Sequence, residues 1–143
     1  MLINQISVFI ENQPGRLTEV TEVLAQNKVD ITALSLADTS EFGILRLIVD
    51  KPDVAQMALR EAGFAVKATD VLAVAMDDQP GGLSAVLRII KEAGISIEYM
   101  YAFVGKKEGK AVVVMRVSDL EAAVTALQHE RKTTVNARDI YNL

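Results

Sequence analysis

The sequence contains no cysteine and no tryptophan, and its only histidine is His129. Without cysteine the chain can form neither disulfides nor thiolate metal sites, and it has no thiolate nucleophile. A single histidine cannot build a histidine-rich metal site. Asp77 and Asp78 are adjacent carboxylates, but neighbours at the end of a strand point to opposite sides, and the sequence offers them no third ligand. We therefore expect no metal, no cofactor and no catalytic residue, so that the chain is not an enzyme.

A positive net charge and long apolar runs are missing as well. The chain carries 15 basic and 19 acidic residues, a formal net charge of −4, and its isoelectric point is near 5.0. Nucleic-acid binding depends on a basic surface, so it is not expected here. No apolar run approaches the ~20 residues of a membrane span, and residues 1–6 lack the basic start of a secretory signal. We expect a cytoplasmic protein with neither a nucleic acid nor a membrane as partner.

What the sequence does contain is an internal repeat. Residues 11–17 (ENQPGRL) are echoed by residues 77–83 (DDQPGGL) at an offset of 66. The offset grows to 69 toward the ends of the two copies, which indicates small insertions in the loops of the second copy. The chain is therefore predicted to hold two copies of one unit, residues 1–68 and residues 69–143.

Each copy has the periodicity of a strand, a helix, two strands, a helix and a final strand. A helix with apolar residues three and four positions apart begins after each Pro-Gly pair. Asp50, followed by Pro52, is expected to cap the second helix of copy one, and residues 118–121 (SDLE) are expected to form a capping box in copy two. The predicted strands cover residues 5–10, 30–37, 44–49 and 66–70, and residues 95–103, 112–117 and 135–141.

This order of elements is typical of the split βαβ, or ferredoxin-like, unit, a four-stranded antiparallel sheet with both helices on one face. We therefore predict an α+β fold made of two such units in tandem. A unit of about 70 residues buries little core by itself. The sheet face that the helices leave open is expected to be covered by another copy or to bind a ligand.

Between the first strand and the first helix, each copy has a polar or acidic pair followed by Pro-Gly-x-Leu. The two segments are residues 12–17 (NQPGRL) and residues 77–83 (DDQPGGL). In this order of elements the motif resembles the ACT domain family, whose members are small-molecule sensors, usually for amino acids, attached to or associated with metabolic enzymes. The resemblance covers the chain twice and leaves no segment for a catalytic domain. It implies a stand-alone tandem ACT protein.

The two Pro-Gly loops have two explanations. They are turns, because proline fixes φ and glycine accepts a positive φ. They can also be binding sites, because glycine lets a ligand approach the backbone and the first helical turn offers unpaired N–H groups to a carboxylate. The polar residues before each turn can receive an ammonium group. The candidate residues are Asn12, Gln13, Pro14, Gly15, Arg16 and Leu17 in copy one, and Asp77, Asp78, Gln79, Pro80, Gly81, Gly82 and Leu83 in copy two.

The resemblance also implies that the site lies between two domains, with the loop of one facing the second strand of its neighbour. The residues of this opposite wall are Ile31, Ala33 and Leu34, or Ile97, Tyr99 and Met100. The copies differ along this strand, where Tyr99, Tyr101 and Phe103 replace small residues of copy one. Either large residues on one copy pack against small ones on the other, or the two sites differ and only one kind binds well.

The expected function is a non-catalytic sensor. The ligand is expected to be an amino acid or a related small carboxylate, the chain to form a homodimer, and the regulated partner to be an enzyme acting in trans. The alternative is a purely structural pairing module without a ligand, because the Pro-Gly loops are also explained by turn geometry.

Overall fold

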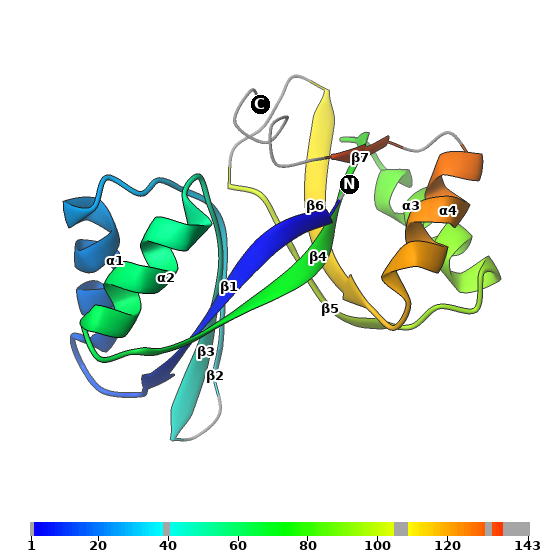
Figure 1. Ribbon diagram of the computed structural model, residues 1–143. Helices are drawn as coiled ribbons and strands as arrows, with labels where there is room; N and C mark the ends of the chain where they lie inside the picture. Colours follow the sequence, from blue (N-terminus) through cyan, green and yellow to red (C-terminus); the bar gives the residue numbers. More distant parts are fainter. Residues whose placement is uncertain (1, 39–40, 105–108, 131–132, 136–143) are drawn as a thin grey trace. The chain divides into compact units, whose positions relative to one another are not determined.

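The computed structural model describes residues 2–38, 41–104, 109–130 and 133–135. The chain divides into two compact units (Figure 1). The first unit comprises residues 4–69, and the second comprises residues 1–3 together with residues 70–143.

The first unit is a layer of strands with two helices on one face (Figure 1). Its strands run in the order β2-β3-β1, with β4 next to β1, and β3 is antiparallel to both of its neighbours. Val8 pairs with Leu45, so their side chains share the face on which Val20, Leu24 and Leu59 of the helices pack. The elements are β1 (Leu2–Glu11), α1 (Arg16–Gln26), β2 (Ile31–Asp38), β3 (Phe42–Val49), α2 (Pro52–Glu61) and the start of β4 (Ala65–Asp77).

The second unit repeats this arrangement. Its strands run in the order β4-β6-β5, and β7 pairs with the other side of β4. Val74 pairs with Val113, and Val86, Ile90 and Leu127 of the helices pack in the same core. The elements after β4 are α3 (Gly82–Glu92), β5 (Ile97–Ala102), β6 (Lys110–Val117), α4 (Leu120–His129) and β7 (Thr133–Val135). The predicted α+β fold of two βαββαβ units is confirmed.

The join between the copies differs from the prediction. The last strand of copy one, expected over residues 66–70, continues without a break as the first strand of copy two, so that β4 is 13 residues long. Residues 65–77 contain neither glycine nor proline, and nothing in this segment ends a strand. At the other end of the chain, β7 is Thr133–Val135, and residues 136–141 of the predicted strand lie outside the described residues.

Asp50 does not cap α2, contrary to the prediction. The residue before the helix is Lys51, and no side chain caps this end. The carboxylate of Asp50 instead accepts a hydrogen bond of 2.9 Å from the amide of Asp30, and the amide of Asp50 donates to the Asp30 carbonyl at 3.2 Å. Asp50 therefore ties the end of β3 to the turn before β2.

Ser118 has the same role in the second unit, so the predicted capping box is also wrong. Its hydroxyl accepts the amide of Ser96 at 3.0 Å, and its own amide donates to the Ser96 carbonyl at 2.9 Å. The cap of α4 is Asp119, whose carboxylate accepts the amide of Ala122 at 3.0 Å. The duplication has thus kept a strand-to-turn bridge at both positions.

Replacing Asp50 with alanine is expected to lower the free energy of unfolding by about 1 kcal/mol, because the Asp30 amide loses its acceptor. Asp50→Asn keeps an oxygen in the same place and is expected to retain most of that stability. Urea denaturation of the three proteins measures the difference. An equal loss in both variants would show that the charge, and not the hydrogen bond, matters.

Candidate functional site

The two Pro-Gly loops share one backbone conformation. Gly15 and Gly81 precede α1 and α3 with φ of 88° and 87°, in the left-handed region that favours glycine. In the first loop the backbone amide of Gln13 donates to the Glu11 carbonyl at 2.8 Å, and in the second the backbone amide of Gln79 donates to the Asp77 carbonyl at 3.0 Å. The turn explanation of these loops therefore holds in both copies, and any binding role is additional to it.

The helix that follows each loop presents free amides. In the first unit the N–H groups of Gly15, Leu17 and Thr18 have no hydrogen-bond acceptor among the described residues. This is the usual condition of a first helical turn, where no preceding carbonyl is in position. Together with the helix dipole, these donors favour a negatively charged group near this turn.

A pocket of about 220 Å³ lies beside the first loop. The strand register brings its walls together, because Ile10 pairs with Gly43 and the amide of Asn12 donates to the Glu41 carbonyl at 3.1 Å. The loop is thereby held against the turn between β2 and β3. The lining residues are Ile10, Glu11, Asn12, Gln13, Leu17, Leu36 and Gly43.

The lining of this pocket, which we call the loop pocket, has two chemical characters. Three of its lining residues, Glu11, Asn12 and Gln13, are polar, with one carboxylate and two amides among their side chains. The remaining side chains are aliphatic, and Gly43 adds none. A small molecule with a charged end and an apolar end would find complementary groups for both.

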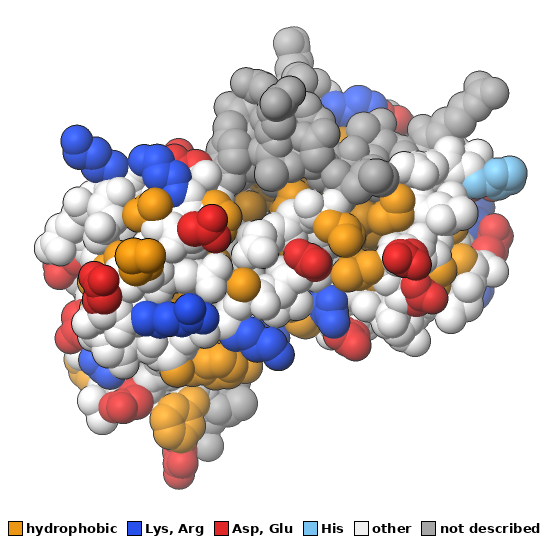
Figure 2. All heavy atoms as spheres, in the orientation of Figure 1, with side chains coloured by type: hydrophobic (Ala, Val, Ile, Leu, Met, Phe, Trp, Pro, Cys, Tyr) orange, Lys and Arg blue, Asp and Glu red, His pale blue; other side chains and the backbone are white. Residues whose placement is uncertain are grey.

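Large apolar side chains stay exposed around the loop pocket. Phe42 is 54% exposed and Leu36 is 49% exposed, although hydrophobic residues of this size are usually buried. In Figure 2 hydrophobic side chains gather at the lower left, over the ends of β2 and β3. Exposed apolar surface that is grouped in this way is typical of binding sites.

Only some of the candidate residues of the first loop line the loop pocket. Asn12, Gln13 and Leu17 line the loop pocket, as expected, whereas Pro14 and Gly15 form the turn. Arg16 does not line the pocket itself: its guanidinium pairs with Glu19 at 2.9 Å and with the pocket residue Glu11 at 4.0 Å, and it lies 5.1 Å from the ring centre of Phe64. It lies over Phe64, in the connection between α2 and β4, and it is not among the residues lining the pocket.

Sequence reasoning did not include Ile10, Glu11, Leu36 and Gly43. Ile10 and Glu11 adjoin the predicted loop, whereas Leu36 and Gly43 reach it only through the register of β2 and β3. One sequence signal was available for Gly43. Its equivalent in the second copy, at an offset of 68, is Ala111, so the repeat is broken at this position.

The predicted opposite wall lies away from the loop pocket of its own unit. Ile31 pairs with Val49 at the far end of β2, Ala33 is buried, and Leu34 is 43% exposed. In the second unit, Ile97, Tyr99 and Met100 occupy the corresponding part of β5. A contact between these residues and the loop of another domain stays a prediction.

The second loop differs from the first in its surroundings. Asp77 forms an ion pair with Lys110, whereas the equivalent pair in the first unit is Glu11 and Phe42. The amide of Asp78 donates to the Gly109 carbonyl at 3.0 Å. Of the remaining candidates, Gln79, Pro80 and Gly81 form the turn, Gly82 begins α3, and Leu83 is 40% exposed.

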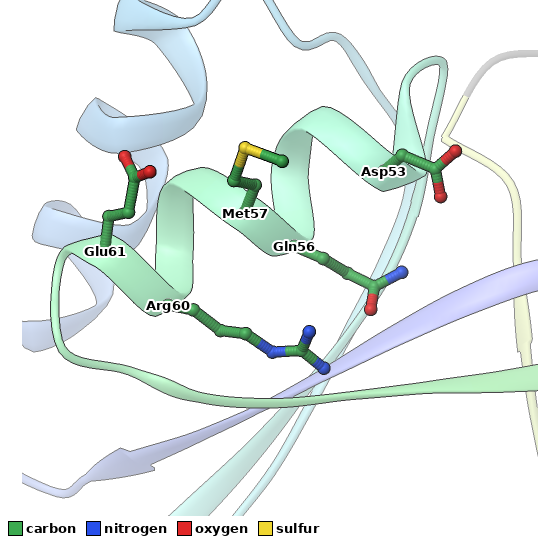
Figure 3. A pocket seen from close by; sticks show the side chains of 5 residues that line it. All are labelled: Asp53, Gln56, Met57, Arg60 and Glu61. Carbon is green, nitrogen blue, oxygen red and sulfur yellow. The ribbon is translucent and has the colours of Figure 1, made fainter.

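A larger pocket, of about 320 Å³, lies on the surface of α2. Figure 3 shows that its five lining side chains all come from this helix, with Gln56 and Arg60 extending to one side and Met57 and Glu61 to the other. Arg60 donates to the Val66 carbonyl at 3.3 Å. These polar groups do not converge on one point, so this pocket is a weaker candidate than the loop pocket.

The part of the chain that the structure describes contains no group of three or more His, Asp or Glu side chains placed to hold a metal ion. None of its helices is both long enough and apolar enough to cross a membrane.

The fold and the paired loops agree with a known family. The model of the ACT domain pair matches residues 1–143. The chain belongs to this family. A search of curated proteins finds no match.

Solved structures agree with membership of the ACT domain pair family. Protein BT0572 from Bacteroides thetaiotaomicron is 41% identical with a TM-score of 0.93, over 100% of this chain and 98% of that one. The ligand-free regulatory subunit of aspartate kinase from Thermus thermophilus is 20% identical with a TM-score of 0.65, over 88% and 91% of the two chains. The corresponding subunit from Thermus flavus is 19% identical with a TM-score of 0.62, over 90% and 94%. At 20% and 19% identity, the similarity to these two regulatory subunits shows a shared fold only.

Proposed function

We propose that this ACT domain pair is a non-catalytic sensor that binds an amino acid at the Pro-Gly loop of its first unit. The observation that carries the proposal is the loop pocket, which is lined both by the polar residues Glu11, Asn12 and Gln13 and by the aliphatic residues Ile10, Leu17 and Leu36. The two ACT domains are taken as residues 1–68 and residues 69–143.

The charges of an amino acid match the groups around the loop. Its carboxylate would be bound by the free amides of Gly15, Leu17 and Thr18 at the positive end of α1. Its ammonium group would be bound by the carboxylate of Glu11 and the side-chain oxygens of Asn12 or Gln13. The turn thus supplies donors and acceptors within one short segment.

Regulation would act through a second copy and a partner enzyme. β2 is an edge strand of the first unit, and Leu34 and Leu36 on it are exposed. A second copy placed against this edge would cover them and form a homodimer. A ligand that binds one arrangement of the domains better than another would shift the population, and thereby alter an enzyme of amino-acid metabolism in trans.

A thermal-shift screen of the twenty amino acids tests the binding step. A ligand at ~100 times its dissociation constant is expected to stabilise the folded protein by about 2.7 kcal/mol. Asn12→Ala is expected to reduce the shift. Asp78→Ala, the equivalent change in the second loop, serves as the matched control and is expected to leave the shift in place. No shift with any amino acid would favour a structural pairing module instead.

A further inference from the structure

We infer that the loop pocket selects an amino acid with an apolar side chain, and that the missing side chain at Gly43 leaves the room for it. The inference rests on the proposed function, because it concerns the side chain of a ligand whose charged groups are bound at the loop. It goes further by naming the ligand class and one residue that sets it.

Gly43 is not required by the backbone. Its φ lies outside the left-handed region, unlike those of Gly15 and Gly81, so an alanine could adopt the same conformation. A Cβ at this position would lie 3.3 Å from Cδ1 of Leu36 and 3.5 Å from Cγ1 of Ile10. A methyl group would therefore project between two side chains that line the pocket. What glycine provides here is space.

The walls around that space are aliphatic. Ile10 belongs to the hydrophobic core of the first unit, and Leu17 and Leu36 complete the apolar side of the pocket. An apolar ligand side chain placed there would leave water and contact these groups favourably. A charged side chain would lose its hydration without a partner on this side, which is costly. The lining therefore discriminates between the two classes.

The second unit has a different set of residues at the same positions. Ala111 pairs with Met76 as Gly43 pairs with Ile10, and Ala102 replaces Leu36. Next to them, Lys110 stands at the position that the exposed Phe42 has in the first unit, and it forms an ion pair with Asp77. The methyl group of Ala111 packs against the core of the second unit. The second loop keeps Met76 and Leu83 at the positions of Ile10 and Leu17, but it lacks the space left by Gly43 and the large side chain of Leu36. One ligand per chain is therefore expected.

Calorimetric titration of the full chain with leucine, phenylalanine, aspartate and lysine tests the inference. Leucine or phenylalanine is expected to bind more tightly than either charged amino acid, at one site per chain. Gly43→Ala is expected to weaken this binding by about tenfold or more, the effect of one methyl group in a hydrophobic pocket. Ala111→Gly, the matched change in the second unit, is expected to leave the affinity within about twofold.

The results that would contradict the inference differ from those that would contradict the proposed function. Tighter binding of aspartate or lysine, or equal effects of Gly43→Ala and Ala111→Gly, would overturn the inference and leave the proposed function standing. If neither leucine nor phenylalanine binds while another of the twenty amino acids does, the inference fails alone. If none of the twenty binds, the proposed function fails and the inference fails with it. Leu36→Ala provides a second variant should Gly43→Ala not fold, and it is expected to weaken the binding of leucine while aspartate and lysine change little.

Discussion

Replacing Leu59 or Leu127 with alanine is expected to lower the free energy of unfolding by about 2–5 kcal/mol. The two leucines occupy equivalent positions of α2 and α4, at an offset of 68, and both are fully buried. Each belongs to the separate core of its own unit. Truncation removes apolar contacts and leaves a cavity that the surrounding side chains fill only in part, so the loss exceeds the transfer free energy of the deleted atoms.

Met57→Ala is the matched control for this experiment. Met57 also lies on α2, but its side chain is 65% exposed on the helix surface seen in Figure 3. Its truncation is expected to change stability by no more than about 0.5 kcal/mol. Urea denaturation measures all three variants. A loss at Leu59 or Leu127 as small as that at Met57 would contradict the assignment of the two cores.

Gly82→Ala is expected to destabilise the protein by about 1–3 kcal/mol. A Cβ at Gly82 would overlap the carbonyl oxygen of Asp77. The obstructing atom belongs to the backbone, so no side-chain rotation can relieve the contact. The loop between β4 and α3 would have to shift, and the hydrogen bond of 3.0 Å from the Gly82 amide to the Gln79 carbonyl would be disturbed.

Ser84→Ala introduces the same side chain two residues further along α3. Ser84 is exposed, and alanine has the higher helix propensity, so this variant is expected to keep or slightly raise the stability. Thermal unfolding of the two variants beside the parent protein checks the comparison. A parental melting temperature for Gly82→Ala would show that the loop accommodates the methyl group without strain.

The architecture was predictable because its signals are local and occur twice. Apolar periods of two and of three to four residues marked the strands and helices of both copies, and the second copy supported each assignment in the first. The caps were harder to predict. Asp50 has the residue type of a cap, but in the folded chain its carboxylate accepts a hydrogen bond from the amide of Asp30, which lies twenty residues away in the sequence. The hydrogen bond to Asp30, which forms only in the folded chain, therefore determines the role of Asp50.

The candidate site was predicted in its contiguous part alone. Asn12, Gln13 and Leu17 belong to one short motif and were found from it. Leu36 and Gly43 lie 19 and 26 residues beyond Leu17, and they reach the pocket through the pairing of β1 with β3 and of β3 with β2. A change of register by one residue would turn Leu36 to the other face, and the Pro-Gly motif carries no information about this register.

The continuous strand β4 restricts how this duplicated chain can evolve. Val66 packs against the first core, and Leu72, Val74 and Met76 belong to the second, so all four are even-numbered positions of one uninterrupted strand. Insertion of a single residue between Val66 and Leu72 would invert the side-chain alternation along the strand, so that the two halves could no longer both face their cores while the strand stays unbroken. A spacer added at this boundary is therefore expected to divide β4 into two strands.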